Sequence, residues 1–153
     1  MNRIAFTLAI EPKSLQKGGK RIRIVANPRR PGRFLPMHFS DAKAKAFKGA
    51  VAALCAPHRP ASPMEGPLCL RATFVMPRPA RLCRRADPAG RVWCDTRPDS
   101  TNLVKGLEDL LTDGRFWHDD NQVALQRIAR QYAAKGESPC IEVEIETLGG
   151  AVE

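Results

Sequence analysis

The stretch that decides the fold is RPDSTNLVKGLEDLLTDGRFWHDDNQV, residues 97–123. Pro98 and Asp99 stand before a segment rich in leucine, in which the apolar residues recur at the spacing of one helical face. At about 100° per residue this pattern predicts a helix of about 14 residues that ends near Gly114. Its apolar face consists of Leu103, Leu107, Leu110 and Leu111. The opposite, polar face carries Asn102, Lys105, Asp109 and Asp113.

The segments on either side of this helix predict a sheet. Apolar runs and apolar/polar alternation favour strands over residues 4–10, 21–25, 68–77 and 140–148. Ser40 is a candidate N-cap for a helix over residues 41–54, and proline and glycine favour irregular loops over 26–36 and 78–98. Residues after Gln122 fit a helix or a strand. The order of elements predicts an α/β (α+β) fold, a single domain over residues 1–153 with one mixed sheet packed by two helices.

Composition points to a protein of a reducing compartment. No apolar run is long enough to span a bilayer, and the first residues lack the cleavage site of a signal peptide. The five cysteines are an odd set without CxxC spacing, which argues against a disulfide framework and a zinc ribbon. Cys83, Cys94 and His118 could form a metal site, but incidental thiols are the favoured interpretation. We therefore expect a cytoplasmic protein without membrane association.

The charge is divided unevenly along the chain. The net charge is +9, and residues 1–98 hold 20 Lys and Arg against 5 Asp and Glu, whereas residues 99–153 hold 5 against 11. This asymmetry favours a polyanion-binding body around an acidic centre over a merely solvated basic surface. The candidate DNA-binding residues come from two basic runs that also contain glycine and proline. They are Lys20, Arg21, Arg29, Arg30, Arg33, Arg84 and Arg85.

Acidic residues stand at both ends of the central helix. Asp99 precedes it, and Asp119 and Asp120 follow it. Since such a helix spans about 20 Å, the later pair meets Asp99 only if the chain doubles back. Clustered carboxylates repel one another unless a cation such as Mg²⁺ neutralises them, and Lys105 could then touch the scissile phosphate. The alternatives are a helix cap at Asp99, a surface lysine and an acidic turn.

At these residues the sequence resembles the RusA family of Holliday junction resolvases. The family pattern of an acidic-x-acidic-Asn-Leu-x-x-Lys helix followed by W-x-Asp-Asp-x-Gln-Val is similar to PDSTNLVKGLEDLL and FWHDDNQV here. The resemblance implies a homodimer that nicks four-way DNA junctions in pairs with Mg²⁺, and a strand after Gln122. It implies Asp99, Asn102, Lys105 and Asp120 as catalytic residues, and Asp99, Asp119 and Asp120 as metal ligands.

One position departs from the family pattern. Thr101 stands where the second acidic residue is expected, and a hydroxyl is a poorer Mg²⁺ ligand than a carboxylate. Water could replace the missing ligand, Asp95 could substitute for it, or the protein could be a catalytically weakened branched-DNA-binding protein. A general RNA-binding domain ranks below these, because aromatic residues make up only 6% of the chain.

Two kinds of residue near the motif have structural interpretations that we favour over functional ones. Trp93 and Trp117 are expected to pack rather than to stack on bases. His118 is expected to be a turn residue rather than a proton donor.

Overall fold

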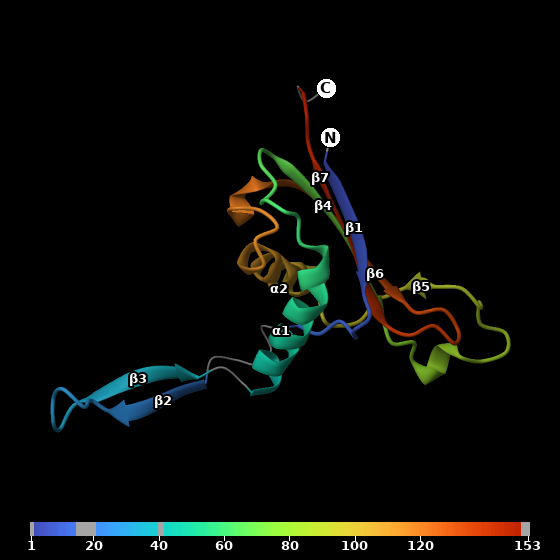
Figure 1. Ribbon diagram of the computed structural model, residues 1–153. Helices are drawn as coiled ribbons and strands as arrows, with labels where there is room; N and C mark the ends of the chain where they lie inside the picture. Colours follow the sequence, from blue (N-terminus) through green and yellow to red (C-terminus); the bar gives the residue numbers. More distant parts are fainter. Residues whose placement is uncertain (1, 15–20, 40–41, 151–153) are drawn as a thin grey trace.

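A five-stranded mixed sheet forms the body of the molecule (Figure 1). The computed structural model describes residues 2–14, 21–39 and 42–150. The strand order is β1-β7-β4-β6-β5, and the one parallel pair in it is β4 with β6. The expected α+β fold with a mixed sheet is confirmed. The strands are β1 Arg3–Leu8, β4 Leu68–Met76, β5 Val92–Trp93, β6 Val123–Tyr132 and β7 Cys140–Thr147.

The central strand β4 and its neighbour β7 have different sequence patterns. β4 lies between β7 and β6 and is buried and apolar except at the half-buried Arg71 and Thr73, which lie on the face away from the helices. β7 instead alternates, with its apolar side chains in the core and its glutamates on the other face. There Arg71 of β4 donates hydrogen bonds to Glu144 and Glu146. Charged pairs therefore line the face of the sheet opposite the core.

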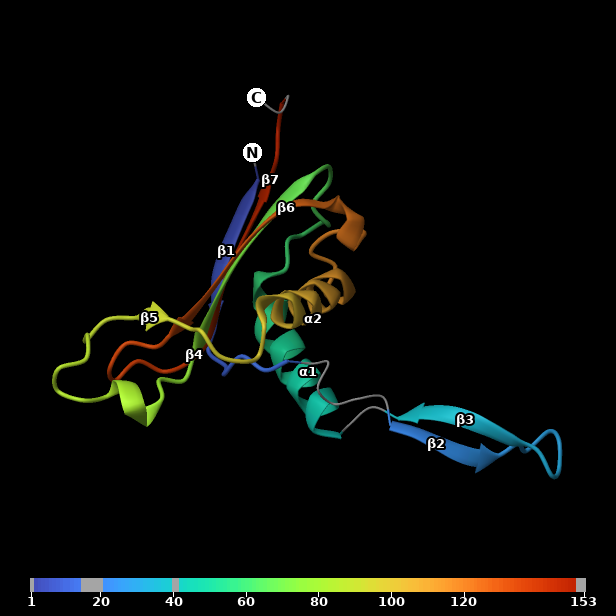
Figure 2. The same ribbon diagram turned by 180° about the vertical axis from the view of Figure 1, so that it is seen from behind.

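Two α-helices, α1 Ala42–Cys55 and α2 Ser100–Asp113, cover one face of the sheet, as Figure 1 and the reverse view in Figure 2 both show. The four predicted leucines of α2 are buried against it together with Val104. A 3-10 turn, η1 Ala56–His58, follows α1. In the described part of the chain no helix is both long and apolar enough to cross a bilayer.

The segment over residues 26–36 differs from the expectation of an irregular loop. Strands β2 Arg21–Ala26 and β3 Phe34–Phe39 form a separate antiparallel sheet that projects from the body in Figure 1. The loop prediction was wrong for Ala26, which ends β2, and for residues 34–36, which begin β3. Within this pair of strands Pro36 lies opposite Ile24. A two-stranded sheet has only edge strands, so proline's missing N–H can face away from the partner strand. Ser40, the predicted cap of α1, lies outside the described residues.

The second predicted loop, residues 78–98, is more ordered than its composition indicates. It contains a 3-10 turn, η2 Ala80–Leu82, and the short strand β5, which pairs with the end of β6. Arg78 holds the loop together, since its guanidinium donates to the carbonyl oxygens of Leu82, Pro88 and Gly90. A basic side chain that the sequence alone would assign to a surface thus has a structural role.

Candidate metal and DNA site

The start of α2 fixes the first acidic residue of the candidate site. Asp99 is the N-cap of α2, with one carboxylate oxygen accepting from the Asn102 backbone N–H at 2.9 Å and the other from its side-chain amide at 3.1 Å. Arg130 of β6 donates to the carbonyl oxygens of Thr96 and Pro98, just before the cap. The sheet and the helix together therefore position the exposed Asp99 carboxylate.

The chain doubles back after α2, as the acidic pair requires. Phe116 and Trp117 are fully buried, and they anchor the connection between α2 and the 3-10 turn η3 Asp120–Gln122. Asp119 caps this turn, and the Gln122 side chain accepts from the backbone N–H groups of His118 and Asp119. β6 then begins, which confirms the strand implied after Gln122.

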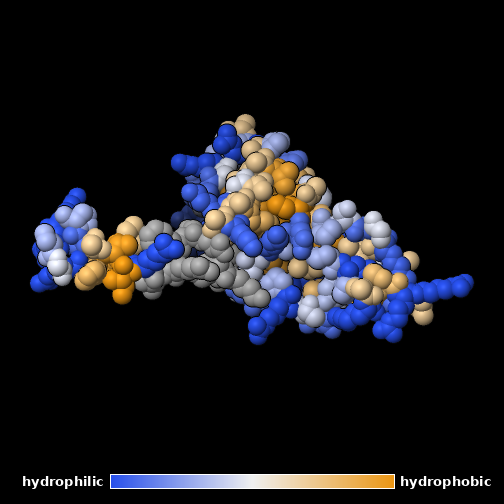
Figure 3. Space-filling view, turned by 90° about the horizontal axis from the view of Figure 1, so that it is seen from below, coloured by the Kyte–Doolittle hydropathy of each residue, from blue (hydrophilic) through white to orange (hydrophobic). Residues whose placement is uncertain are grey.

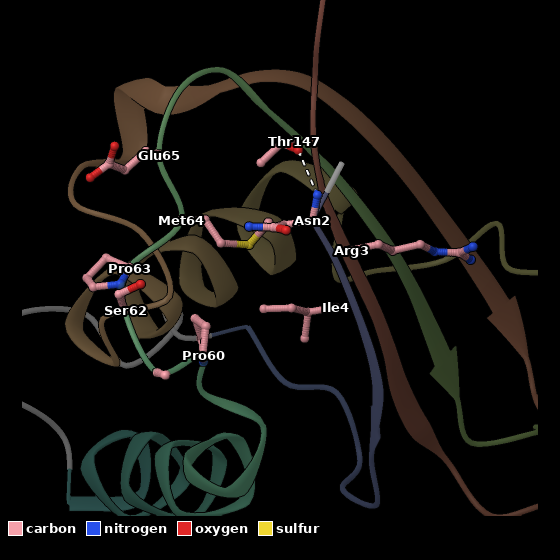
Figure 4. Close-up of a pocket in the computed structure, with 10 residues that line it drawn as sticks. Asn2, Arg3, Ile4, Pro60, Ser62, Pro63, Met64, Glu65 and Thr147 are labelled. Atoms are coloured by element: carbon pink, nitrogen blue, oxygen red, sulfur yellow. Dashed lines mark hydrogen bonds between the residues drawn. The ribbon is translucent and has the colours of Figure 1, made fainter.

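Gln122 also ties the acidic turn to the start of β4. Its side-chain amide donates to the carbonyl oxygens of Met64 at 3.0 Å and Gly66 at 3.1 Å. A pocket of about 670 Å³ lies beside that segment. Figure 4 shows residues that line it, among them Asn2, whose backbone N–H donates to the Thr147 hydroxyl. The pocket is lined by none of the predicted catalytic residues, so it is separate from the candidate site.

An ion pair joins α2 to the acidic turn. The Lys105 ammonium lies 3.1 Å from an Asp120 carboxylate oxygen and 3.1 Å from Asp109, one turn further along α2. The hydrogen bonds that Lys105 donates, first to Asp109 and then to Asp120, raise the pKa of Lys105. In return Lys105 lowers the pKa of Asp120, mainly through its hydrogen bond, so that carboxylate stays ionised. Two of the predicted catalytic residues, Lys105 and Asp120, are therefore in contact.

A further acidic residue near this pair was missed by the sequence analysis. Glu108 is only 7% exposed, and burial raises its pKa, although a hydrogen bond from Gln126 acts in the opposite direction. The charges of Lys105 and Asp120 also act on it, so it belongs to the same electrostatic neighbourhood. Helical periodicity places position 108 next to Leu107 and near Leu111 on the apolar side of the helix. This position was the sequence signal that could have predicted a buried glutamate.

The structure places the three predicted metal ligands against different partners. Asp99 faces Asn102, Asp119 accepts from the Asn121 backbone N–H at 2.8 Å, and Asp120 faces Lys105. Within residues 2–14, 21–39 and 42–150, no three His, Cys, Asp or Glu side chains form a group that could hold a metal ion. The ligand set therefore stays a prediction. Carboxylate oxygens nevertheless suit Mg²⁺, which commonly takes one or two of them with water and substrate phosphate oxygens.

Thr101 and Asp95, the suggested substitute for the missing acidic ligand, are both exposed. Thr101 is exposed, and the first turn of α2 contains no acidic side chain. Asp95, the suggested substitute, is an exposed residue 3.6 Å from Arg81. The departure at Thr101 is thus also visible in the folded chain.

The predicted DNA-binding residues lie in two separate places. Arg29, Arg30 and Arg33 are exposed at the turn between β2 and β3. Arg84 and Arg85 are exposed in the loop before β5, on the other side of the body in Figures 1 and 2. Lys20 lies outside the described residues, and Arg21 is the first residue of β2.

The two tryptophans near the motif differ from each other. Trp117 is fully buried and donates to the Thr112 hydroxyl at 2.7 Å, so its expected packing role is confirmed. Trp93 is 73% exposed, and the expectation that it packs was wrong. It is the last residue of the edge strand β5, and it points outward between the partly buried Val92 and the buried Cys94, which follows the strand. His118 is exposed in the turn before η3.

Comparison with known proteins agrees with this arrangement. Residues 20–146 match the family described as Endodeoxyribonuclease RusA, a range that includes both acidic segments, Lys105, strands β4, β5 and β6, and nearly all of β7. The chain belongs to the RusA endodeoxyribonuclease family. It is also 32% identical over 115 residues to an uncharacterized protein, YqaN, of Bacillus subtilis (strain 168), covering 71% of this chain and 78% of that one. Membership of this family supports a DNA endonuclease activity.

Removing the Lys105 ammonium should raise the pKa of Asp120. In Lys105→Ala we expect that pKa to move up toward the ordinary aspartate value of about 3.9, because the hydrogen bond that favours the ionised form is lost. Since Asp120 has a lowered pKa, any stabilisation by the Lys105–Asp120 pair is present at pH values above the ordinary aspartate pKa. It is lost as the pH falls through the lowered pKa of Asp120. Carboxyl ¹³C chemical shifts followed against pH measure this.

The matched control is Lys48→Ala, an exposed lysine of α1. It should leave the Asp120 titration unchanged. An Asp120 pKa in Lys105→Ala equal to that of the unsubstituted protein would show that the ion pair does not hold this carboxylate in solution.

Proposed function

We propose that this protein is an Mg²⁺-dependent endonuclease that resolves Holliday (four-way) DNA junctions by paired nicking, in DNA recombination and repair. The observation that supports it best is the contact between Lys105 and Asp120, which joins the two halves of the family motif. Asp99, held by Asn102, supplies a second exposed carboxylate at the start of the same helix. Such oxygen ligands can hold the cation of a phosphodiester hydrolase, and a lysine beside them can stabilise the negative charge that develops on the phosphate.

Each residue of the site has a role in this proposal. Asp99 and Asp120 would hold the ion, with Asp119 as the third ligand; when bound, Mg²⁺ activates a water or stabilises the leaving oxygen of a phosphodiester. Asn102 orients Asp99 through its side-chain amide. Lys105 keeps Asp120 ionised and donates to a phosphate oxygen, where negative charge develops during cleavage.

The wider proposal concerns the assembly and the substrate. A homodimer would place two such sites on opposite strands of a branched DNA, and a symmetric dimer presents the same surface twice. Residues 1–153 would act as one RusA-like domain in the cytoplasm, where the five free cysteines stay reduced. The arginines of the β2–β3 turn and of the loop before β5 would bind phosphates.

The test compares a labelled synthetic four-way junction with a matched linear duplex, each in Mg²⁺ and in EDTA. We expect paired nicks in the junction alone, lost in EDTA. Asp120→Asn should reduce cleavage at least about 100-fold, the scale expected when a charge-stabilising group is removed, while junction binding survives or tightens because a negative charge near phosphate is gone. Gel electrophoresis of the products and of the shifted complexes measures both.

Asp113→Asn is the matched control, since Asp113 is exposed at the far end of the same helix. It should cut at the rate of the unsubstituted protein. Equal cleavage by Asp120→Asn and Asp113→Asn would contradict the site, and equal cleavage of duplex and junction would contradict the substrate.

A second candidate function is a catalytically weakened branched-DNA-binding protein. It is favoured by Thr101, because the first turn of α2 lacks any acidic side chain. With Thr101 the site has three carboxylates, those of Asp99, Asp119 and Asp120, and therefore less negative charge for Mg²⁺ than a site with a fourth carboxylate at position 101. Such a protein would bind junctions in a strongly salt-dependent way without cutting them.

Restoring the carboxylate separates the two candidates. Thr101→Asp should raise cleavage by about 10-fold or more if the missing ligand limits metal binding. Thr101→Asn introduces a side chain of the same size as aspartate but without its charge, and it should not raise cleavage. Cleavage rates measured against Mg²⁺ concentration decide this, and a rate for Thr101→Asp no higher than for Thr101→Asn would show that the position is not limiting.

A further inference from the structure

The β2–β3 hairpin leaves apolar side chains in water. Ile24 is 74% exposed and Phe34 is 67% exposed, and both lie on the arm that projects from the body in Figure 1. In the space-filling view of Figure 3 this arm carries an orange, apolar patch next to its blue, hydrophilic tip. A two-stranded hairpin is marginally stable alone, so an exposed apolar patch on it indicates a surface that another molecule covers.

The register of the hairpin sorts these side chains onto one face. Ile24 lies opposite Pro36, and Ala26 lies opposite Phe34. Because directly opposed residues share a face and successive residues alternate, these four side chains form one apolar face. Leu35, opposite Val25, belongs to the other face, and it is 43% exposed.

The turn of the hairpin is basic and well defined. Asn27 is hydrogen bonded at both ends of the turn, with its N–H donating to the Arg33 carbonyl and its side chain accepting from the Arg29 N–H. Gly32 has φ of 80°, which favours glycine, and two prolines stiffen the remainder. The exposed arginines of this turn are Arg29, Arg30 and Arg33.

Charge decides what covers the apolar face. Residues 21–39 contain five arginines and no aspartate or glutamate. A second copy of the hairpin would bring the same positive charges together, whereas a nucleic acid supplies phosphates for them. Apolar side chains beside arginines are also the combination by which architectural proteins enter the minor groove and separate neighbouring base pairs.

We infer that the β2–β3 hairpin is an arm that selects branched DNA by inserting Ile24 and Phe34 from the minor groove where base stacking is interrupted. The arginines of the turn hold the flanking phosphates. Unstacking costs energy in a continuous duplex and less at a branch point, where the stack is already broken, so insertion favours the branched substrate. The inference rests on the proposed function and adds the element that recognises the branch.

The test uses the full chain in EDTA, so that no DNA is cut. The probes are a four-way junction with 2-aminopurine at the branch point and a linear duplex with 2-aminopurine in the same sequence. The unsubstituted protein should brighten the 2-aminopurine of the junction, because the base leaves the stack. Ile24→Ser/Phe34→Ser should abolish this brightening and weaken junction binding roughly 10-fold or more, with duplex binding nearly unchanged.

Two further variants separate insertion from other effects. Leu35→Ser, on the opposite face, should keep both the brightening and the junction affinity. Arg29→Ala/Arg30→Ala/Arg33→Ala should weaken both DNAs and lower the slope of log K against log salt by about 3, since three phosphate contacts are lost. Thermal unfolding of each variant confirms that the body is folded.

Distinct results would overturn the inference. If Ile24→Ser/Phe34→Ser retains the brightening and the junction affinity, the hairpin does not recognise the branch, although the proposed function stands. If sedimentation shows that this variant changes from dimer to monomer, the apolar face is an interface between copies. If the unsubstituted protein binds junction and duplex equally, the inference fails, and if it also cuts both equally in Mg²⁺, the proposed function fails with it.

Discussion

The return of the chain from α2 to β6 is the constraint on which the candidate site depends. Without it, the acidic residues at the two ends of the motif would be separated by the length of the helix. Buried Phe116 and Trp117 make the reversal compact, and Gln122 fastens the turn to the segment before β4. The Lys105–Asp120 contact is the product of this reversal.

That contact also explains why acidic residues gather in an otherwise basic protein. Lys105 lies between Asp109 and Asp120, and Glu108 is buried close enough for these charges to act on it. A single ammonium thus offsets part of the repulsion among the carboxylates in the absence of a metal ion. The described arginines predicted to bind DNA lie elsewhere, on the hairpin and on the loop before β5, where they can approach a polyanion from both sides of the body.

The periodicity of apolar residues was sufficient to predict the helices and strands that are buried on one side only. The leucine face of α2 and the alternation of β7 each report a single covered face, so their sequences predict them well. Proline and glycine were misleading at β3 and β5, because pairing with a neighbouring strand outweighs local preference there. Pro36 is tolerated because β3 has an edge with no partner strand.

The contacts within the candidate site could not be predicted from the sequence. Sequence spacing and the family resemblance pointed to Asp99, Lys105 and Asp120, yet nothing in the sequence shows that Lys105 bridges Asp109 and Asp120. The exposure of Trp93 was also beyond the sequence, since it depends on which way the edge strand β5 turns its side chains. These features arise from tertiary packing, which local patterns do not encode.

The central claim is that Asp99 and Asp120 serve one divalent ion. Titration of ¹⁵N-labelled protein with Mn²⁺, a paramagnetic ion that binds oxygen ligands as Mg²⁺ does, tests it most directly. The account predicts that the backbone amides of residues 99–102 and 119–122 broaden first, and that Asp120→Asn removes the effect at low Mn²⁺. Broadening that begins instead at the glutamates of β7, or that is the same in Asp120→Asn, would contradict it.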